Sequence, residues 1–292
     1  MLTEHQRHWG VDQWAAFLTA QAIPCIPRSK LTLRALEETQ GEDLSAADLT
    51  SLVIADPYLC LRLLREAEKR RTQRLGHDTT TPLGAVMQLG IKTFHNLVRS
   101  STETDDSRPG LLACSARATL ASQIAQMWGR ARLDIAPEEV AIAALLAEIG
   151  ELLLWHFAPE LPQAAQEALD SGRAHRSAEA QQLACGFRFR DLSLKCANVW
   201  ALPPLLIQLI RGQDTVRANL CKLYLDTARH LVAGADNPAL PDDLAQAKRL
   251  IPHASLEWLT GHMNGINEER AARLIEAAQW ILDRENGQPE EF

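Results

Sequence analysis

The sequence predicts an all-α protein, and three observations carry this prediction. Aromatic residues make up only 5% of the 292 residues, whereas 46% are hydrophobic, with alanine and leucine dominant. This composition favours helices over sheets. Apolar residues recur at helical spacing in several segments, and no two alternating segments are joined by a hairpin signal.

Breaks in the pattern divide the chain into an N-terminal helix, two lobes and a C-terminal region. The N-terminal helix falls within residues 1–22, and a pair of prolines then leads into a first helical lobe, 23–98. A polar, acidic loop with a Pro-Gly turn signal separates this lobe from a second one, 111–211. We expect the two lobes to form one domain, 23–212, followed by a C-terminal helical region and short tail, 213–292.

Apolar faces support the first and the last of these helical regions. Each face is a set of residues spaced three or four apart, as on one side of an amphipathic helix. The N-terminal face consists of Val11, Trp14, Phe17 and Leu18, and the C-terminal face of Leu220, Leu223, Tyr224, Thr227 and Leu231.

Charge, cysteines and hydropathy favour a soluble cytoplasmic protein. The formal net charge is −7, and the six cysteines show no C-x-x-C spacing, which argues against a zinc site or a disulfide framework. The N-terminus is too polar for a signal peptide. The most apolar run, taken to be Leu202 to Ile210, contains two prolines and is shorter than a membrane span. We therefore expect no membrane association.

One basic cluster raises the question of nucleic-acid binding. It consists of Arg65, Lys69, Arg70, Arg71 and Arg74. Because the chain is acidic overall and no aromatic residues are interleaved with these charges, a solvated helix end is the better interpretation. We expect no nucleic-acid partner.

The segment Ala143 to Ala158 is the most informative part of the chain. It is predicted to be a buried helix, because Leu145, Leu146, Ile149, Leu152 and Leu153 recur at helical spacing. The run Leu145-Leu146-Ala147-Glu148-Ile149-Gly150 resembles the HDOD family, a regulatory branch of the HD metal-dependent phosphohydrolase superfamily. Where that family has His-Asp, this chain has Ala147-Glu148, and Glu151 replaces a lysine.

Four further motifs follow the order of the same family over about two hundred residues. The chain is therefore identified as an HDOD-like protein, which implies an HD-like helical domain preceded by a helical N-terminal lobe, with additional C-terminal helices. The motifs are Ile23-Pro24-Cys25-Ile26-Pro27, the Asp56-Pro57 junction between two helices within 44–68, Leu89-Gly90 with Asn96-Leu97, and Trp200-Ala201-Leu202-Pro203.

The resemblance also implies that the metal site of the superfamily is degenerate here. Its ligand positions fall on Cys114, Ala147, Glu148 and Phe189. A catalytic divalent metal needs several converging nitrogen or oxygen ligands, so we expect no metal, no cofactor and no enzymatic activity. Glu148 and Glu151 are interpreted as the edge of a helix face near solvent or as partners of an arginine. The ancestral metal cleft is expected to be filled or apolar.

The function that the resemblance implies is regulation by protein contact. The expected partner is a bacterial signalling protein: a histidine kinase, a response regulator or a cyclic-dinucleotide enzyme. Two alternatives stay open, a residual phosphohydrolase or nucleotide-binding protein that uses the ancestral cleft, and a scaffold with no small ligand. Candidate partner contacts are Tyr58, Arg62, Arg65 and Arg99, although Tyr58 fits the core equally well.

Overall fold

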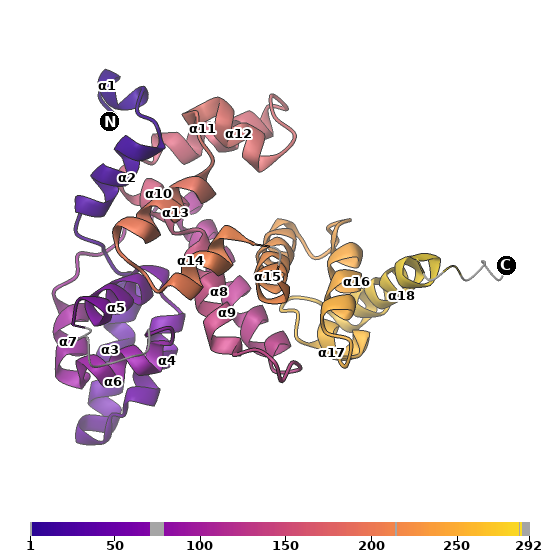
Figure 1. Cartoon of the computed structure of the whole chain (residues 1–292), viewed down its shortest axis with the longest axis horizontal. Coiled ribbons are helices and arrows are strands. Elements are labelled where there is room, and N and C mark those ends of the chain that lie inside the picture. Colours follow the sequence, from indigo (N-terminus) through magenta and orange to yellow (C-terminus); the bar gives the residue numbers. More distant parts are fainter. Residues whose placement is uncertain (1, 71–78, 214, 286, 288–292) are drawn as a thin grey trace.

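The computed structural model describes residues 2–70, 79–213, 215–285 and 287. Within these ranges the chain forms helices and no strands, and the one β-type contact is an isolated parallel bridge between Cys25 and Glu103. The all-α prediction is confirmed. Figure 1 shows a body of packed helices from which the C-terminal helices project.

The N-terminal segment contains two helices where the sequence predicted one. These are α1 (Glu4–Arg7) and α2 (Val11–Ala20), separated at Gly10, which has extended backbone and precedes the first turn of α2. The predicted apolar face is present, since Trp14 and Leu18 are buried. It packs against α13 (Phe189–Val199), so the N-terminal helix joins the second lobe in space.

The first lobe is built around α5 (Pro57–Arg70), most of whose apolar residues are buried. The other helices of this lobe are α3 (Pro27–Gln40), η1 (Gly41–Asp43), α4 (Ala46–Ile54), α6 (Pro82–Leu89) and α7 (Ile91–Arg99). Helix α6 contacts both α4 and α5, and the group lies at the lower left of Figure 1.

Asp56 fixes the junction between α4 and α5. Its Oδ1 accepts hydrogen bonds from the backbone N–H groups of Tyr58 and Leu59, both at 3.0 Å, as a helix N-cap does. Its Oδ2 accepts from the Ile26 N–H at 2.8 Å and the Ser29 hydroxyl at 2.7 Å. This buried carboxylate therefore joins the proline-rich leading segment to the start of α5, which explains two of the family motifs together.

The second lobe surrounds a pair of long core helices, α8 (Pro109–Gly129) and α9 (Pro137–Ala147), which pack along each other. The chain then continues into α10 (Ile149–Phe157). The remaining helices of the lobe are α11 (Glu160–Asp170), α12 (Ser177–Cys185), α13 and α14 (Pro204–Arg211). The single helix expected over 143–158 is thus two helices, interrupted at Glu148.

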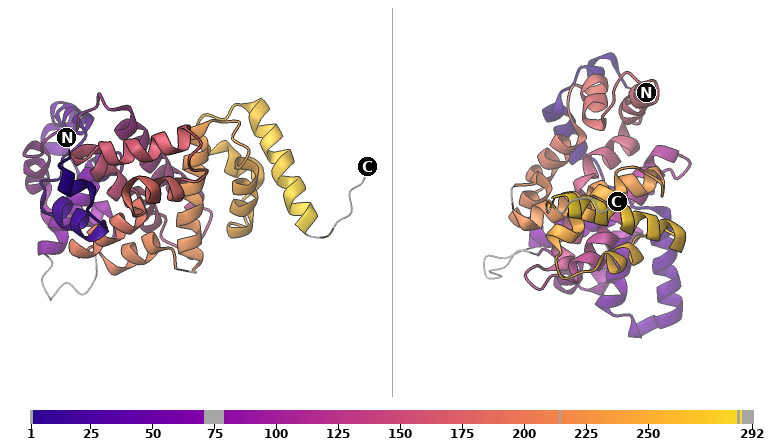
Figure 2. Two further views of the ribbon diagram at one scale, coloured as in Figure 1. Left: turned by 90° about the horizontal axis from the view of Figure 1, so that it is seen from above. Right: turned by 90° about the vertical axis from the view of Figure 1, so that its right-hand side faces the viewer.

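The C-terminal region begins with α15 (Val216–Ala233), which packs on α8 and α9. It continues through α16 (Leu240–Leu250), α17 (Leu256–Gly261) and α18 (Glu268–Glu285). Both Figure 1 and the left view of Figure 2 show α16 to α18 extending away from the body as an arm. His230 on α15 and Asp243 on α16 link the arm to the body, with Nδ1 and Oδ2 2.6 Å apart.

One described segment, Pro137–Phe157, is long and apolar enough to cross a membrane by length and composition. It comprises α9, Glu148 and α10, and 72% of its most apolar window is buried inside the fold. The most apolar run is thus this core segment, and the expectation that it would be Leu202 to Ile210 was wrong. Burial of this extent is that of a core helix, which is apolar on all sides because it is surrounded by other helices.

Candidate functional site

The break at Glu148 lies where α10 comes very close to α13. The Gly150 N–H donates to the Ser193 hydroxyl at 2.9 Å. A Cβ atom on residue 150 would lie 2.7 Å from both the Phe189 carbonyl oxygen and the Ser193 nitrogen, which is shorter than a side chain tolerates. Only glycine permits this approach. It places Phe189, at the first turn of α13, beside the junction that carries Ala147 and Glu148.

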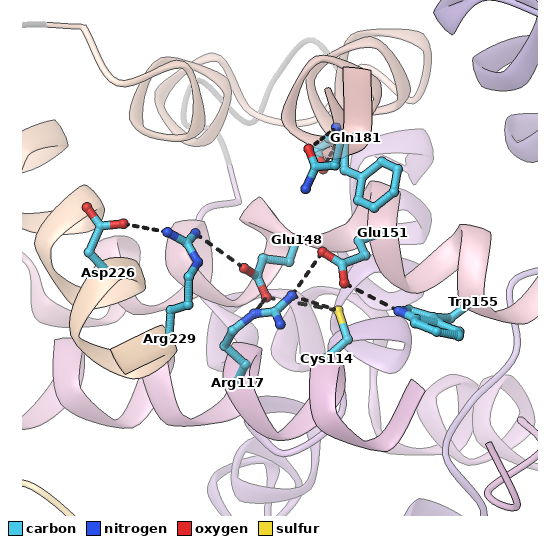
Figure 3. Close-up of polar contacts among 10 residues, drawn as sticks. Cys114, Arg117, Glu148, Glu151, Trp155, Gln181, Asp226 and Arg229 are labelled. Atoms are coloured by element: carbon cyan, nitrogen blue, oxygen red, sulfur yellow. Dashed lines mark hydrogen bonds and ion pairs between the residues drawn. The ribbon is translucent and has the colours of Figure 1, made fainter. Parts of the chain in front are cut away.

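Arg117 on α8 occupies the centre of this junction (Figure 3). Its Nε lies 2.5 Å from Glu148 Oε2, and its Nη2 lies 2.9 Å from Glu151 Oε2 and 3.4 Å from the Cys114 sulfur. The arginine, with 17% of its side chain exposed, thus binds both carboxylates at once. Such charge-assisted hydrogen bonds are about twice as strong as neutral ones.

Two further side chains extend this network. Arg229 on α15 lies between Asp226, at 2.8 Å, and Glu148 Oε1, at 3.9 Å. The Trp155 indole N–H donates to Glu151 Oε1 at 3.3 Å. The network therefore joins α8, α10 and α15, and so connects the second lobe to the first helix of the C-terminal region.

The electrostatics of the site do not fit a metal ion. Burial raises the pKa of Glu148, and the charge of Arg117 opposes that shift by stabilising the carboxylate. Burial also raises the pKa of the Cys114 thiol, as does the nearby charge of Glu151. Because the Arg117 guanidinium already binds both carboxylates, a divalent cation placed between them would meet a positive charge. Within the described residues, no three His, Cys, Asp or Glu side chains gather as a metal site.

A cavity of about 660 Å³ opens beside the network. Ala147, Glu148 and Phe189 all line it, together with Arg117 and Glu151. The ancestral cleft is therefore not filled, and its wall combines apolar surface with charged side chains. Ala147 and Phe189 supply apolar surface as expected, but the first leaves space because its side chain is a single methyl group, and arginines from α8 and α15 add charge.

The structure brings the four degenerate metal positions together. Cys114 lies 4.0 Å from Glu148 through its sulfur, and the other three positions share the cavity wall. Sequence reasoning allowed an arginine partner for Glu148 and Glu151, but it did not identify Arg117 or Arg229. Arg117 follows Cys114 by three residues, so both lie on the same face of one helix. This spacing is the sequence signal that could have identified Arg117.

Of the four predicted partner contacts, Tyr58 was wrong. This side chain is fully buried, and its hydroxyl donates to the Leu152 carbonyl at 2.6 Å across the two lobes. Arg62 donates to the Ile23 carbonyl and the Ser101 hydroxyl, and Arg65 lies 4.7 Å above the Trp200 ring. These arginines therefore make contacts within the chain. Arg99 is exposed and pairs with Glu37 at 2.8 Å.

The basic cluster is described only in part. Lys69 and Arg70 both pair with Glu66 at the solvated end of α5, whereas Arg71 and Arg74 lie outside the described residues.

One known family matches most of the chain. The HDOD domain matches residues 23–216, about two thirds of the chain and almost the span expected from the sequence. The chain belongs to the HDOD family. Among curated proteins, none matches the sequence.

Two solved structures share the fold of this HDOD protein at low sequence identity. The MmoQ response regulator from Methylococcus capsulatus str. Bath is 21% identical, with a TM-score of 0.62 over 88% of this chain and 99% of that chain. A virulence factor from Campylobacter jejuni subsp. jejuni is 15% identical, with a TM-score of 0.65 over 93% of this chain and 99% of that chain. At these identities the likeness concerns the fold.

Proposed function

We propose that this HDOD protein is a non-catalytic regulatory module that acts by contact with another signalling protein in the bacterial cytoplasm. The partner class is a histidine kinase, a response regulator or a cyclic-dinucleotide enzyme. The observation that carries the non-catalytic part is Arg117, whose guanidinium contacts Cys114 and Glu148, two of the four positions that bind metal in the superfamily.

In this proposal Arg117 takes the place of the metal ion. Metal-dependent hydrolysis needs a cation with an open coordination position, which activates water. Arg117 supplies the positive charge but has neither an open position nor the charge density to lower the pKa of bound water. A helix junction held by an arginine keeps the fold while the reaction is lost. Similarity in fold to a protein described as a response regulator supports the signalling part of the proposal.

The test is metal content together with hydrolysis. Protein purified without chelators, and protein incubated with Mn²⁺, Fe²⁺ or Zn²⁺ and then desalted, should both carry far less than one metal ion per chain by elemental analysis. Neither sample should hydrolyse nucleotides or cyclic dinucleotides. About one or two tightly held ions per chain, as a dinuclear or mononuclear site would give, contradicts the proposal.

The regulatory part needs its own experiment, for which Arg99 is the remaining predicted contact. Arg99→Glu should weaken binding to a signalling protein from the same cytoplasm, because an exposed charge there would face an acidic partner surface. Arg130→Glu, an equal change at an exposed arginine at the end of α8, is the matched control. Equal binding by both variants would place the interface elsewhere.

A further inference from the structure

The cavity beside Glu148 is more basic than the chain as a whole. Among the described residues that line it, five are basic and three are acidic, whereas the whole chain has a net charge of −7. The basic residues come from α8, α13 and α15 and the position before α13: Arg117, Arg188, Arg190, Lys222 and Arg229.

Three of these five charges are compensated by carboxylates. Arg117 binds Glu148 and Glu151, Arg188 pairs with Asp191 at 3.0 Å, and Arg229 pairs with Asp226. The charges that remain are Arg190 and Lys222. No carboxylate pairs with either of them within the described part of the chain.

These two cations differ in how firmly they are held. The Arg190 guanidinium donates to the Ile210 carbonyl at 3.0 Å and to the Arg211 carbonyl, at the end of α14. It also lies against Gly212, where a Cβ atom would come within 2.5 Å of its Nη2. Lys222 is exposed on α15, and no hydrogen bond or ion pair with another described residue holds its ammonium, so it can turn toward a ligand. The wall thus combines a fixed cation with an adjustable one.

The rest of the wall includes apolar, neutral polar and acidic residues. Phe189, Leu209, Ile210 and Leu225 supply apolar surface, while Glu148 and Glu151 close the side next to α10. An anion is repelled from the carboxylate side and attracted to the α13 and α15 side. A volume of about 660 Å³ with apolar walls and a few polar groups lies in the range of small-molecule sites.

We propose that this cavity binds a small organic anion. A phosphate or carboxylate group of the ligand is held by Lys222 and Arg190, and its apolar body packs against Phe189, Leu209 and Leu225. A phosphate and a carboxylate would both bind these two cations, and the binding experiment shows which group the cavity prefers. The proposal is independent of whether the protein binds a signalling partner.

Part of this site lies outside the HDOD match, which ends at residue 216. Lys222, Leu225 and Arg229 all belong to α15, which begins at Val216. The cavity is therefore completed by the C-terminal region, and α15 also leads into the projecting arm. A ligand held between α13 and α15 contacts both the HDOD domain and the helix that leads into that arm.

Binding can be measured on the full chain with simple probes. Isothermal titration calorimetry would compare phenyl phosphate and benzoate with phenol, which lacks the anion, and with inorganic phosphate, which lacks the body. We expect phenyl phosphate, benzoate or both to saturate below about 10 mM and to bind at least about tenfold more tightly than phenol. Which of the two is tighter identifies the anionic group. Failure of both to saturate, or equal affinity for phenol, would overturn the proposal.

Two matched pairs of variants locate the site. Lys222→Glu should weaken the better probe at least about tenfold, while Lys92→Glu, an equal change at an exposed lysine on α7, should leave its affinity unchanged. Ala113→Trp should fill part of the cavity and block binding, whereas Ala116→Trp, at an exposed alanine on the same helix outside the lining, should not. Unchanged binding in both Lys222→Glu and Ala113→Trp would contradict the assignment.

Discussion

Two carboxylates stand at corresponding breaks in the two lobes, and they are satisfied in opposite ways. Asp56 separates α4 from α5 and accepts four hydrogen bonds from neutral donors, with no exposure to solvent. Glu148 separates α9 from α10, is held by the Arg117 guanidinium and borders a cavity. At the first break, neutral donors satisfy Asp56 completely inside the core. At the second, the Arg117–Glu148 pair places charged groups in the wall of the cavity.

The largest effect is expected at the first junction. Asp56→Ala removes the N-cap of α5 and leaves the buried Ile26 N–H and Ser29 hydroxyl without their acceptor. We expect a loss of about 4 kcal/mol in the free energy of unfolding, measured by urea denaturation. Asp48→Ala is the comparison: it removes only the side chain of the α4 capping box that accepts from the Ser45 N–H, and should cost much less than Asp56→Ala. Similar losses in both variants would show that burial of Asp56 contributes nothing.

The second junction is tested first through its close backbone contact. Gly150→Ala would force a methyl group to within 2.7 Å of α13 backbone atoms, so we expect a loss of about 3 kcal/mol. Gly261→Ala is the control, because that position on α17 has nothing within 4 Å. The control should be neutral or stabilised by up to about 1 kcal/mol. A Gly150→Ala protein as stable as wild type would mean that α10 and α13 can separate freely.

Asp243 offers a third arrangement, a carboxylate bonded to a histidine. Burial raises its pKa to about 6, although the hydrogen bond with His230 opposes the shift. The folded protein therefore keeps a proton that the unfolded chain releases near pH 4. The stability gained from this proton is complete below pH 4 and is lost as pH rises through 6.

Asp243→Asn removes that titration. Between pH 4 and pH 7, the free energy of unfolding of wild type minus that of the variant should fall by about 2 kcal/mol. Denaturation series at several pH values measure this difference. A difference that rises with pH would show that the pair favours the ionised carboxylate instead.

The contrast between the two junctions also explains what the sequence could predict. The Asp56-Pro57 motif is local, because an N-cap and a proline at the first helical position are readable from neighbouring residues. The break at Glu148 has no such signal, since the apolar periodicity continues through it and Glu and Ile are ordinary helix residues. The reason for the break is a contact between Gly150 and Ser193 on α13, which lies forty-three residues further along the chain.

The site was predicted in part for the same reason. Resemblance to the HDOD family placed Cys114, Ala147, Glu148 and Phe189 around one point, and the structure brings them together. Their replacement by small or apolar residues suggested a cleft that is filled or apolar. The charge in its wall could not be predicted, because the arginine that pairs with Glu148 lies thirty-one residues away along the chain. Likewise, nothing local predicts that α15 would complete the wall, or that Arg62 and Arg65 would make contacts inside the chain.

We propose that Arg117 and Glu148 act as a coupled pair in place of a metal centre, and a double-mutant cycle tests this pairing most directly. Arg117→Met alone leaves a buried carboxylate unpaired and should cost about 3 kcal/mol, and somewhat less at pH 5 than at pH 8, because protonation neutralises Glu148. In a Glu148→Gln background the same substitution should cost about 1 kcal/mol, which gives a coupling energy of about 2 kcal/mol. A coupling energy near zero would contradict the claim.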